Sequence, residues 1–146
     1  MGLVDELRNS RVCIDTAPFI YFIEKHPKYL DVIKPIFIGI NKGEIEAITS
    51  TITLIEVLVH PFRNKNETLV EKYRDILLYA EGLTTFEINH KISEMSSRLR
   101  AKYTIKTPDA IQIATGVLYG AAKYLTNDLD LKKIEEIEVL VLDDFL

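Results

Sequence analysis

Four acidic residues stand where their carboxylates could do chemistry: Asp15, Glu56, Asp109 and Asp128. Each follows an apolar segment closely or lies in the first turns of a predicted helix, so each side chain is held by a rigid element. Two unit charges about 4 Å apart repel by 4 kcal/mol at an effective dielectric near 20. A cluster of such groups therefore needs protons or a cation. Carboxylate oxygens suit Mg²⁺ or Mn²⁺ better than zinc. A site for such an ion indicates a nuclease or another phosphoryl hydrolase.

Each acid also has a purely structural interpretation. Asp15 can cap the helix that follows it, and Glu56 can complete a capping box with Thr53. Asp109 can interact with a helix dipole, and Asp128 can cap a turn. These interpretations are favoured for each acid taken singly. Four carboxylates at one edge of a sheet favour a metal site.

The segment around Asp109 predicts a buried helix that holds the acid in place. Thr107 is a good N-cap and Pro108 suits the first helical position, where no backbone donor is needed. Apolar residues then follow at spacings of three and four, at Ala110, Ile113, Ala114 and Val117. Asp109 is thus expected at the start of a helix whose body is packed inside the protein.

Strands and helices alternate along the chain. Strands are predicted at 11–15, 45–50, 83–87, 123–125 and 139–142. Helices are predicted at 17–24, 29–41, 53–60, 67–80, 89–102 and 107–119. Pro35 is expected to kink its helix, and Pro61 to end or bend the helix before it. This alternation predicts an α/β fold with a mainly parallel sheet that is covered on both faces.

In such a sheet the working site lies outside the carboxyl ends of the strands. Asp15 and Asp128 come just after their strands, and Glu56 lies one turn into the helix after its strand. These three acids are expected at one edge of the sheet. No strand directly precedes Asp109, so its place at that edge is a weaker inference.

Composition sets further limits. With 146 residues, 47% of them hydrophobic and 27% charged, the chain suits one folded domain spanning 1–146. A net charge of −4 argues against a protein that coats nucleic acid through overall charge, but allows a local basic groove. The single cysteine, Cys13, excludes an internal disulfide. The polar N-terminus and the lack of a long apolar run predict a cytoplasmic protein that does not bind a membrane.

Four segments of the sequence resemble the signatures of the PIN-domain ribonucleases. They are IDTAPFIYFIE (14–24), TSTITLIEVLVHP (49–61), IKTPDAIQIATG (105–116) and YLTNDLDL (124–131). Any one of them is a weak signal, but all four occur in the family's order over nearly the whole chain. Within the family, the chain most resembles the small VapC-type toxins. The resemblance implies a PIN-like three-layer α/β/α fold with a central mainly parallel sheet.

The resemblance also implies an activity and a set of site residues. Asp15, Glu56 and Asp109 match the three core acids of the family, Asp128 the fourth, and Thr126 the hydroxyl residue beside it. The implied protein is a Mg²⁺- or Mn²⁺-dependent endoribonuclease that uses a metal-activated water. It is a homodimer whose site is blocked by a cognate antitoxin, and its products carry a 5′-phosphate and a 3′-hydroxyl.

Two further residues are candidates for supporting roles. Thr16 is adjacent to Asp15, and Asp130 is a second acid that competes with Asp128 for the fourth position. Ala17 stands where many relatives have an asparagine, so one polar contact of the family site is expected to be missing.

A basic cluster precedes Asp109 and consists of Arg98, Arg100, Lys102 and Lys106. These side chains can be the solvated end of a helix, with cations near its negative pole. They can also form a rim that binds RNA phosphates beside the acids. The two interpretations are compatible.

Three other functions compete with the ribonuclease. One is a catalytically silent PIN-like binding module, which the presence of all four acids disfavours. Another is a different Mg²⁺-dependent phosphohydrolase. The third is a phospho-receiver domain, which would need paired acids after its first strand, where Asp15 stands alone.

Overall fold

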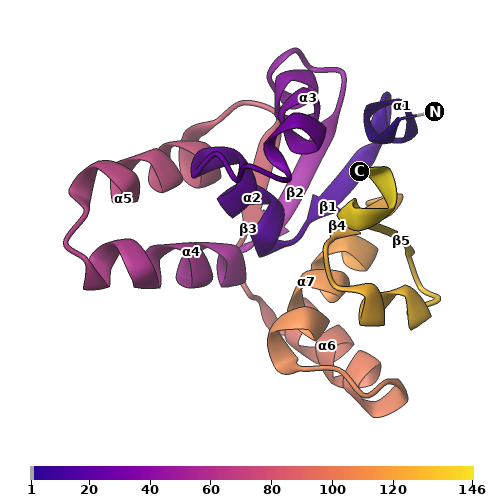
Figure 1. The fold of residues 1–146 in the computed structure, drawn as a ribbon. Coiled ribbons are helices and arrows are strands. Elements are labelled where there is room, and N and C mark those ends of the chain that lie inside the picture. Colours follow the sequence, from indigo (N-terminus) through magenta and orange to yellow (C-terminus); the bar gives the residue numbers. More distant parts are fainter. Residues whose placement is uncertain (1) are drawn as a thin grey trace.

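The computed structural model describes residues 2–146 and places a five-stranded parallel sheet at the centre of that part of the chain (Figure 1). The strands are β1 (Arg11–Ile14), β2 (Glu46–Ser50), β3 (Leu83–Phe86), β4 (Lys123–Thr126) and β5 (Glu138–Val141). Their order in the sheet is β3-β2-β1-β4-β5, and each adjacent pair is parallel. The predicted α/β fold with a mainly parallel sheet is confirmed.

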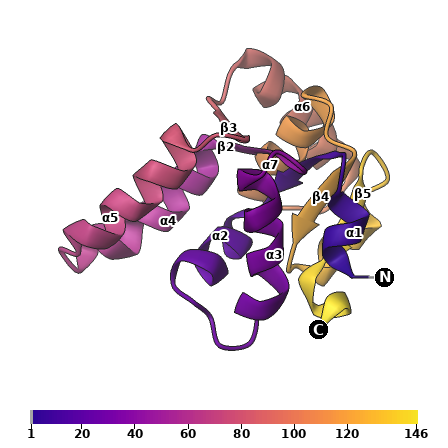
Figure 2. The same ribbon diagram turned by 90° about the horizontal axis from the view of Figure 1, so that it is seen from above.

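The helices cover both faces of the sheet. They are α1 (Leu3–Leu7), α2 (Thr16–Ile23), α3 (Leu30–Asn41), α4 (Thr51–Arg63), α5 (Glu67–Arg74), α6 (His90–Lys102) and α7 (Thr107–Leu118). Val12 and Ile14 of β1 pack in one apolar cluster with α1, α2 and α3, whereas Cys13 packs in a second cluster with α6 and α7. The result is three layers, with α4 and α5 side by side in an arm that projects beyond the sheet (Figures 1 and 2).

The strand order reverses at β1, which is the central strand of the sheet. From β1 it adds β2 and β3 on one side, and it later adds β4 and β5 on the other. Ile14, the last residue of β1, is paired with Leu125 of β4. In open α/β sheets, ligands bind at such a topological switch point, outside the carboxyl ends of the strands. Asp15 is the residue that follows β1 at this point.

Several element boundaries differ from those predicted. Pro35 lies inside α3 as predicted, whereas α4 does not end at Pro61 but runs through it to Arg63. The predicted 67–80 helix ends as α5 at Arg74 and continues as a π-helical segment, Asp75–Tyr79. Helix α1 was not predicted, because five residues are too few for a helical period to show. Short 3₁₀ segments occupy Leu129–Lys133 and Leu142–Phe145.

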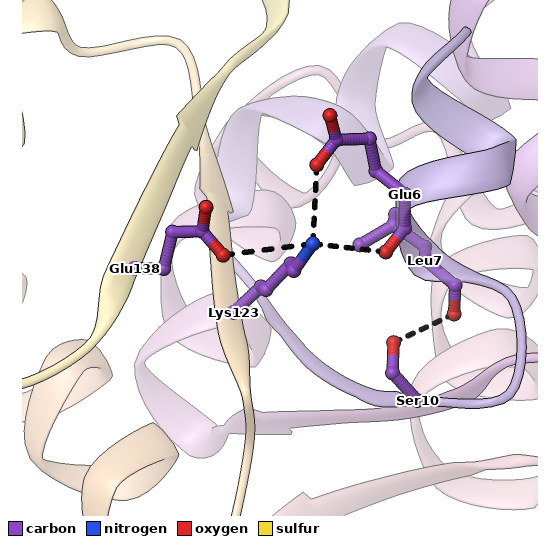
Figure 3. Close-up of polar contacts among 5 residues, drawn as sticks. All are labelled: Glu6, Leu7, Ser10, Lys123 and Glu138. Atoms are coloured by element: carbon purple, nitrogen blue, oxygen red, sulfur yellow. Dashed lines mark hydrogen bonds and ion pairs between the residues drawn. The ribbon is translucent and has the colours of Figure 1, made fainter. Parts of the chain in front are cut away.

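At the amino-terminal end of the sheet, away from Asp15, a lysine connects three elements (Figure 3). Lys123, the first residue of β4, donates to the Glu6 carboxylate and to the Glu6 backbone carbonyl, both over 3.1 Å. Its ammonium also lies 3.5 Å from the Glu138 carboxylate of β5. This contact joins α1 to two strands. Within residues 2–146, no helix combines the length and the apolar character that crossing a membrane requires.

Candidate active site

Asp15 is held from two directions at the end of β1. It is the N-cap of α2, and its Oδ1 accepts a hydrogen bond from the Thr16 backbone amide over 2.7 Å. Its Oδ2 accepts one from the Thr126 hydroxyl, also over 2.7 Å. Burial raises the pKa of Asp15, and the charge of Asp128 adds to this, while the two hydrogen bonds act against it. The helix-capping interpretation is therefore correct for Asp15, but the capping carboxylate also lies at the topological switch point.

Glu56 reaches the same place from α4. The N-cap of this helix is Ser50, whose side chain accepts from the Ile52 amide, so Glu56 does not close a capping box with Thr53 as was considered. The carboxylate instead accepts a 2.6 Å hydrogen bond from the hydroxyl of Thr16. Thr16 thus links two of the acids, with its amide on Asp15 and its hydroxyl on Glu56. Its predicted supporting position is consistent with these contacts.

Asp109 lies in the first turn of α7 and belongs to the same group of charges. The helix starts at Thr107, as its predicted range has it, but its N-cap is Lys106 and not Thr107 as was predicted. The pKa of Asp109 is raised to about 6. Burial is the largest cause, followed by the charges of Asp15, Asp128 and Glu56, while the Lys106 ammonium lowers it. Asp109 is the acid whose position was least certain from the sequence, and its pKa is raised by the charges of all three other acids.

Asp128, rather than Asp130, is the acid that faces this group. The charge of Asp128 raises the pKa values of both Asp15 and Asp109. Its side chain caps the following 3₁₀ turn by accepting from the Asp130 amide over 3.0 Å. The Asp130 carboxylate instead pairs with Lys133 at 3.0 Å. The choice between the two acids, which the sequence left open, thus favours Asp128 on charge proximity.

Beneath the acids lies a buried hydrogen-bond network that the sequence did not reveal. The Gln112 side chain donates to the Thr53 hydroxyl over 2.6 Å and accepts from the Ser50 hydroxyl over 2.8 Å. Thr49 bonds to Thr53 and donates to the Ile14 carbonyl, each over 2.8 Å. The network therefore joins α7, α4, β2 and β1 under the site. Its polar residues fall in apolar segments, where periodicity alone treats them as core positions.

Tyr124 is a further residue near the site that the sequence analysis did not identify. Its side chain is fully buried, with an exposed fraction of 0%, and its hydroxyl has no hydrogen-bond partner among the described residues. Burial raises its pKa well above the usual value, and the charge of Asp15 is the next cause. A tyrosine inside a strand gives no sequence signal of proximity to an acid that lies far away in the chain.

The arrangement supplies donors of the type that Mg²⁺ and Mn²⁺ prefer, namely carboxylate oxygens at a partly buried sheet edge. Burial is the main cause of the raised pKa values of Asp15 and Asp109, and the charges of neighbouring carboxylates add to it. In residues 2–146, however, no three acidic, histidine or cysteine side chains are grouped tightly enough to enclose an ion as they stand. The carboxylates of Asp15 and Glu56 are instead engaged by threonine hydroxyls.

The basic cluster is largely engaged within the protein. The Arg100 guanidinium donates to the Ile105 carbonyl and to the Thr107 hydroxyl, which ties the end of α6 to the start of α7. The other contacts are ion pairs, Lys102 with Glu136 at 3.2 Å and Arg98 with Glu94 at 3.5 Å. Lys106 is the member whose charge reaches the acids, through Asp109. An RNA-binding role for the four residues remains a prediction.

Comparison with known proteins agrees with this geometry. Residues 12–137 match the model of the PIN domain family. The fold is similar to that of a chain in VapBC2 from Rickettsia felis bound to a DNA fragment from their promoter, with a TM-score of 0.70 and 18% identity over 90% of this chain and 98% of that one. It is also similar to a chain of a toxin–antitoxin complex from Klebsiella pneumoniae, with a TM-score of 0.69 and 24% identity over 91% and 98%.

A third solved structure, DNA-bound VapBC from Salmonella typhimurium, gives a TM-score of 0.67 and 16% identity over 91% of this chain and 98% of that one. At these identities the likeness concerns the fold. None of the curated proteins matches the sequence significantly.

Proposed function

Because the chain belongs to the PIN domain family, we propose that it is a Mg²⁺- or Mn²⁺-dependent endoribonuclease and the toxin of a toxin–antitoxin pair. The observation that carries the proposal is that the charges of Asp15, Asp128 and Glu56 all raise the pKa of Asp109, so the four acids lie within reach of one another's charge. Such crowding is costly in a protein unless a cation or protons offset it.

In this proposal Asp15 and Asp109 hold the ion, because they are the two partly buried acids of the group. Glu56 and Asp128 are exposed and complete the site from its rim, where they can orient a water molecule. When bound, the ion supplies Lewis acidity, which polarises a phosphate and lowers the pKa of the attacking water. Thr126 and Thr16 orient the carboxylates of Asp15 and Glu56 through the hydrogen bonds described above.

The reaction is an in-line displacement at phosphorus. A water oxygen forms the new bond to phosphorus, the bond from phosphorus to the 3′-oxygen breaks, and a proton passes to that leaving oxygen. The products are a 5′-phosphate and a 3′-hydroxyl, in line with the family resemblance. Glu56, the one acid of α4, is exposed and would accept the proton of the water.

The proposed partners are RNA as substrate, a cognate antitoxin and a second copy of the chain. The structural neighbours described as VapBC or toxin–antitoxin complexes support an antitoxin. On α4, the apolar side chains of Ile55, Val59 and Phe62 are about half exposed and surround Glu56 in sequence. A protein that covers this face of α4 would also cover Glu56, which gives an antitoxin a direct way to block the reaction.

The deciding experiment is an RNA cleavage assay on the purified protein with Mg²⁺, with Mn²⁺ and with EDTA. We expect cleavage only with a divalent ion, and end-group analysis should find 5′-phosphates. Asp15→Asn should lower the rate by at least about 100-fold while the circular dichroism spectrum stays unchanged. The Asp130→Asn variant is the matched control and should stay active.

Each alternative function has its own outcome in this assay. RNA that binds but is never cut would identify a silent PIN-like module. Hydrolysis of nucleotides or simple phosphate esters in place of RNA would identify a different phosphohydrolase. The antitoxin is tested by co-expression with the protein encoded upstream, which should co-purify with the chain and suppress cleavage.

A further inference from the structure

The hydroxyl of the buried Tyr124 has no hydrogen-bond partner within residues 2–146. Tyr124 is paired with Cys13 in the β1–β4 register. Side chains two apart in a strand share a face, so Tyr124 lies on the same face of β4 as Thr126, whose hydroxyl contacts Asp15. Tyr124 is accordingly in the layer between the sheet and α7, on the face of β4 from which Thr126 contacts the acid.

An unpaired hydroxyl at this place is unusual. Buried polar groups are nearly always hydrogen-bonded, and a phenylalanine would fill the same space without desolvating a hydroxyl. The other polar side chain paired to Tyr124, Cys13, is already engaged, since its thiol donates to the Gln112 carbonyl over 3.4 Å. The acid nearest in register is Asp15, whose backbone amide donates over 2.9 Å to the carbonyl of Leu125, the residue that follows Tyr124.

We propose that the Tyr124 hydroxyl is a positioning donor for Asp15, which forms a hydrogen bond to its carboxylate when that carboxylate turns to hold a divalent cation. With the Thr126 hydroxyl and the Thr16 amide, it would give the carboxylate three donors. Groups that orient a metal-binding side chain commonly change metal affinity or activity by about 10- to 100-fold. This inference rests on the proposed function.

The test is Tyr124→Phe in the full chain, which removes one oxygen and keeps the ring. In EDTA its melting temperature should equal that of the wild type or exceed it by about 2–4 °C, because an unpaired buried hydroxyl is lost. Its Kd for Mn²⁺, measured by calorimetry, should rise about tenfold. At saturating Mn²⁺ the kcat for RNA cleavage should fall with KM unchanged.

Tyr73→Phe is the matched control. Tyr73 is equally buried, but it belongs to the other apolar cluster and its hydroxyl donates to Glu24, which is not one of the four acids. This variant should melt at a lower temperature than the wild type and should bind Mn²⁺ normally. We thus expect opposite effects from the two substitutions. Tyr124→Phe should weaken Mn²⁺ binding and RNA cleavage, whereas Tyr73→Phe should lower the melting temperature.

Two results would overturn the inference alone. In one, Tyr124→Phe binds Mn²⁺ and cleaves RNA like an active wild type. In the other, it loses Mn²⁺ affinity but also melts as low as Tyr73→Phe, which would make the effect a structural one. A wild type that neither binds Mn²⁺ nor cleaves RNA would overturn the proposed function, and the role of Tyr124 with it.

Discussion

The hydroxyl of Thr126 donates a 2.7 Å hydrogen bond to Oδ2 of Asp15, and so joins the end of β4 to the residue that follows β1. The Thr126 hydroxyl oxygen also accepts a hydrogen bond from the Asp128 backbone amide over 3.1 Å, and this contact fixes the turn that carries the fourth acid. One buried hydroxyl therefore orients two of the four acids. The parallel register of β1 and β4 makes this possible, because it brings both strand ends to the same edge.

Thr126→Val should weaken cleavage and Mn²⁺ binding by about 10- to 100-fold, because it keeps the shape of the side chain but removes the donor to Asp15. A matched substitution is Thr115→Val on α7, where the buried hydroxyl donates only to the Ile111 carbonyl of its own helix. This control should leave the cleavage rate within about twofold. Equal activity of the two variants would show that the Thr126 hydroxyl does not matter to the reaction.

Asp109 should make stability depend on pH when no metal is present. Its folded pKa of about 6 lies above the ordinary aspartate value of 3.8, so between these values the folded protein binds more protons than the unfolded one. The free energy of unfolding therefore falls as the pH rises through this range. In EDTA at pH 7.5, Asp109→Asn should increase that free energy by about 1–2 kcal/mol, allowing for solvent screening, and at pH 4 it should not.

Urea unfolding at the two pH values measures this effect. Asp130→Asn, at an exposed acid outside the group, should change the free energy by less than about 0.5 kcal/mol at both. Added Mn²⁺ should stabilise the wild type more than Asp109→Asn, because only the wild type keeps the full set of carboxylates. A variant that is destabilised at pH 7.5 in EDTA would contradict the crowding on which the proposed site depends.

Gln112→Leu should lower the free energy of unfolding by about 1–3 kcal/mol, because it leaves the buried Ser50 hydroxyl without its acceptor and removes the donor to Thr53. Ser50→Ala alone should cost about 1 kcal/mol, since Ser50 also caps α4. The double variant should then cost less than the sum of the two, by at least about 0.5 kcal/mol. Strict additivity in urea unfolding would mean that the two side chains are not coupled.

Lys123→Met should destabilise the fold by about 1 kcal/mol and leave RNA cleavage unchanged. Lys123 is only 19% exposed and joins Glu6 of α1 to Glu138 of β5, but it lies at the amino end of β4, away from the acids (Figure 3). Thermal unfolding and the cleavage assay measure the two effects. A large loss of activity at full stability would indicate that this edge of the sheet communicates with the site.

Much of this protein is determined by local sequence. The apolar run before Asp15, the cap at Asn89 and the helix that begins at Thr107 each depend on neighbours within one or two turns. Such patterns predict elements, because burial period and capping are properties of short segments. The alternation of strands and helices then restricts the fold to a parallel sheet, and three of the acids to its carboxyl edge.

Only the tertiary structure decided how the site residues lie relative to one another, because this depends on which residues far apart in the chain share a face. The sequence assigns the fourth position to Asp128 but allows Asp130 to share it; in the structure the charge of Asp128 reaches Asp109, whereas Asp130 pairs with Lys133. Nothing local places Asp109 beside Asp15, since α7 reaches the edge only by packing under β1 and β2. Strand register places Tyr124 on the face of β4 from which Thr126 contacts the acid, and register is set by pairing between segments that are far apart in the chain.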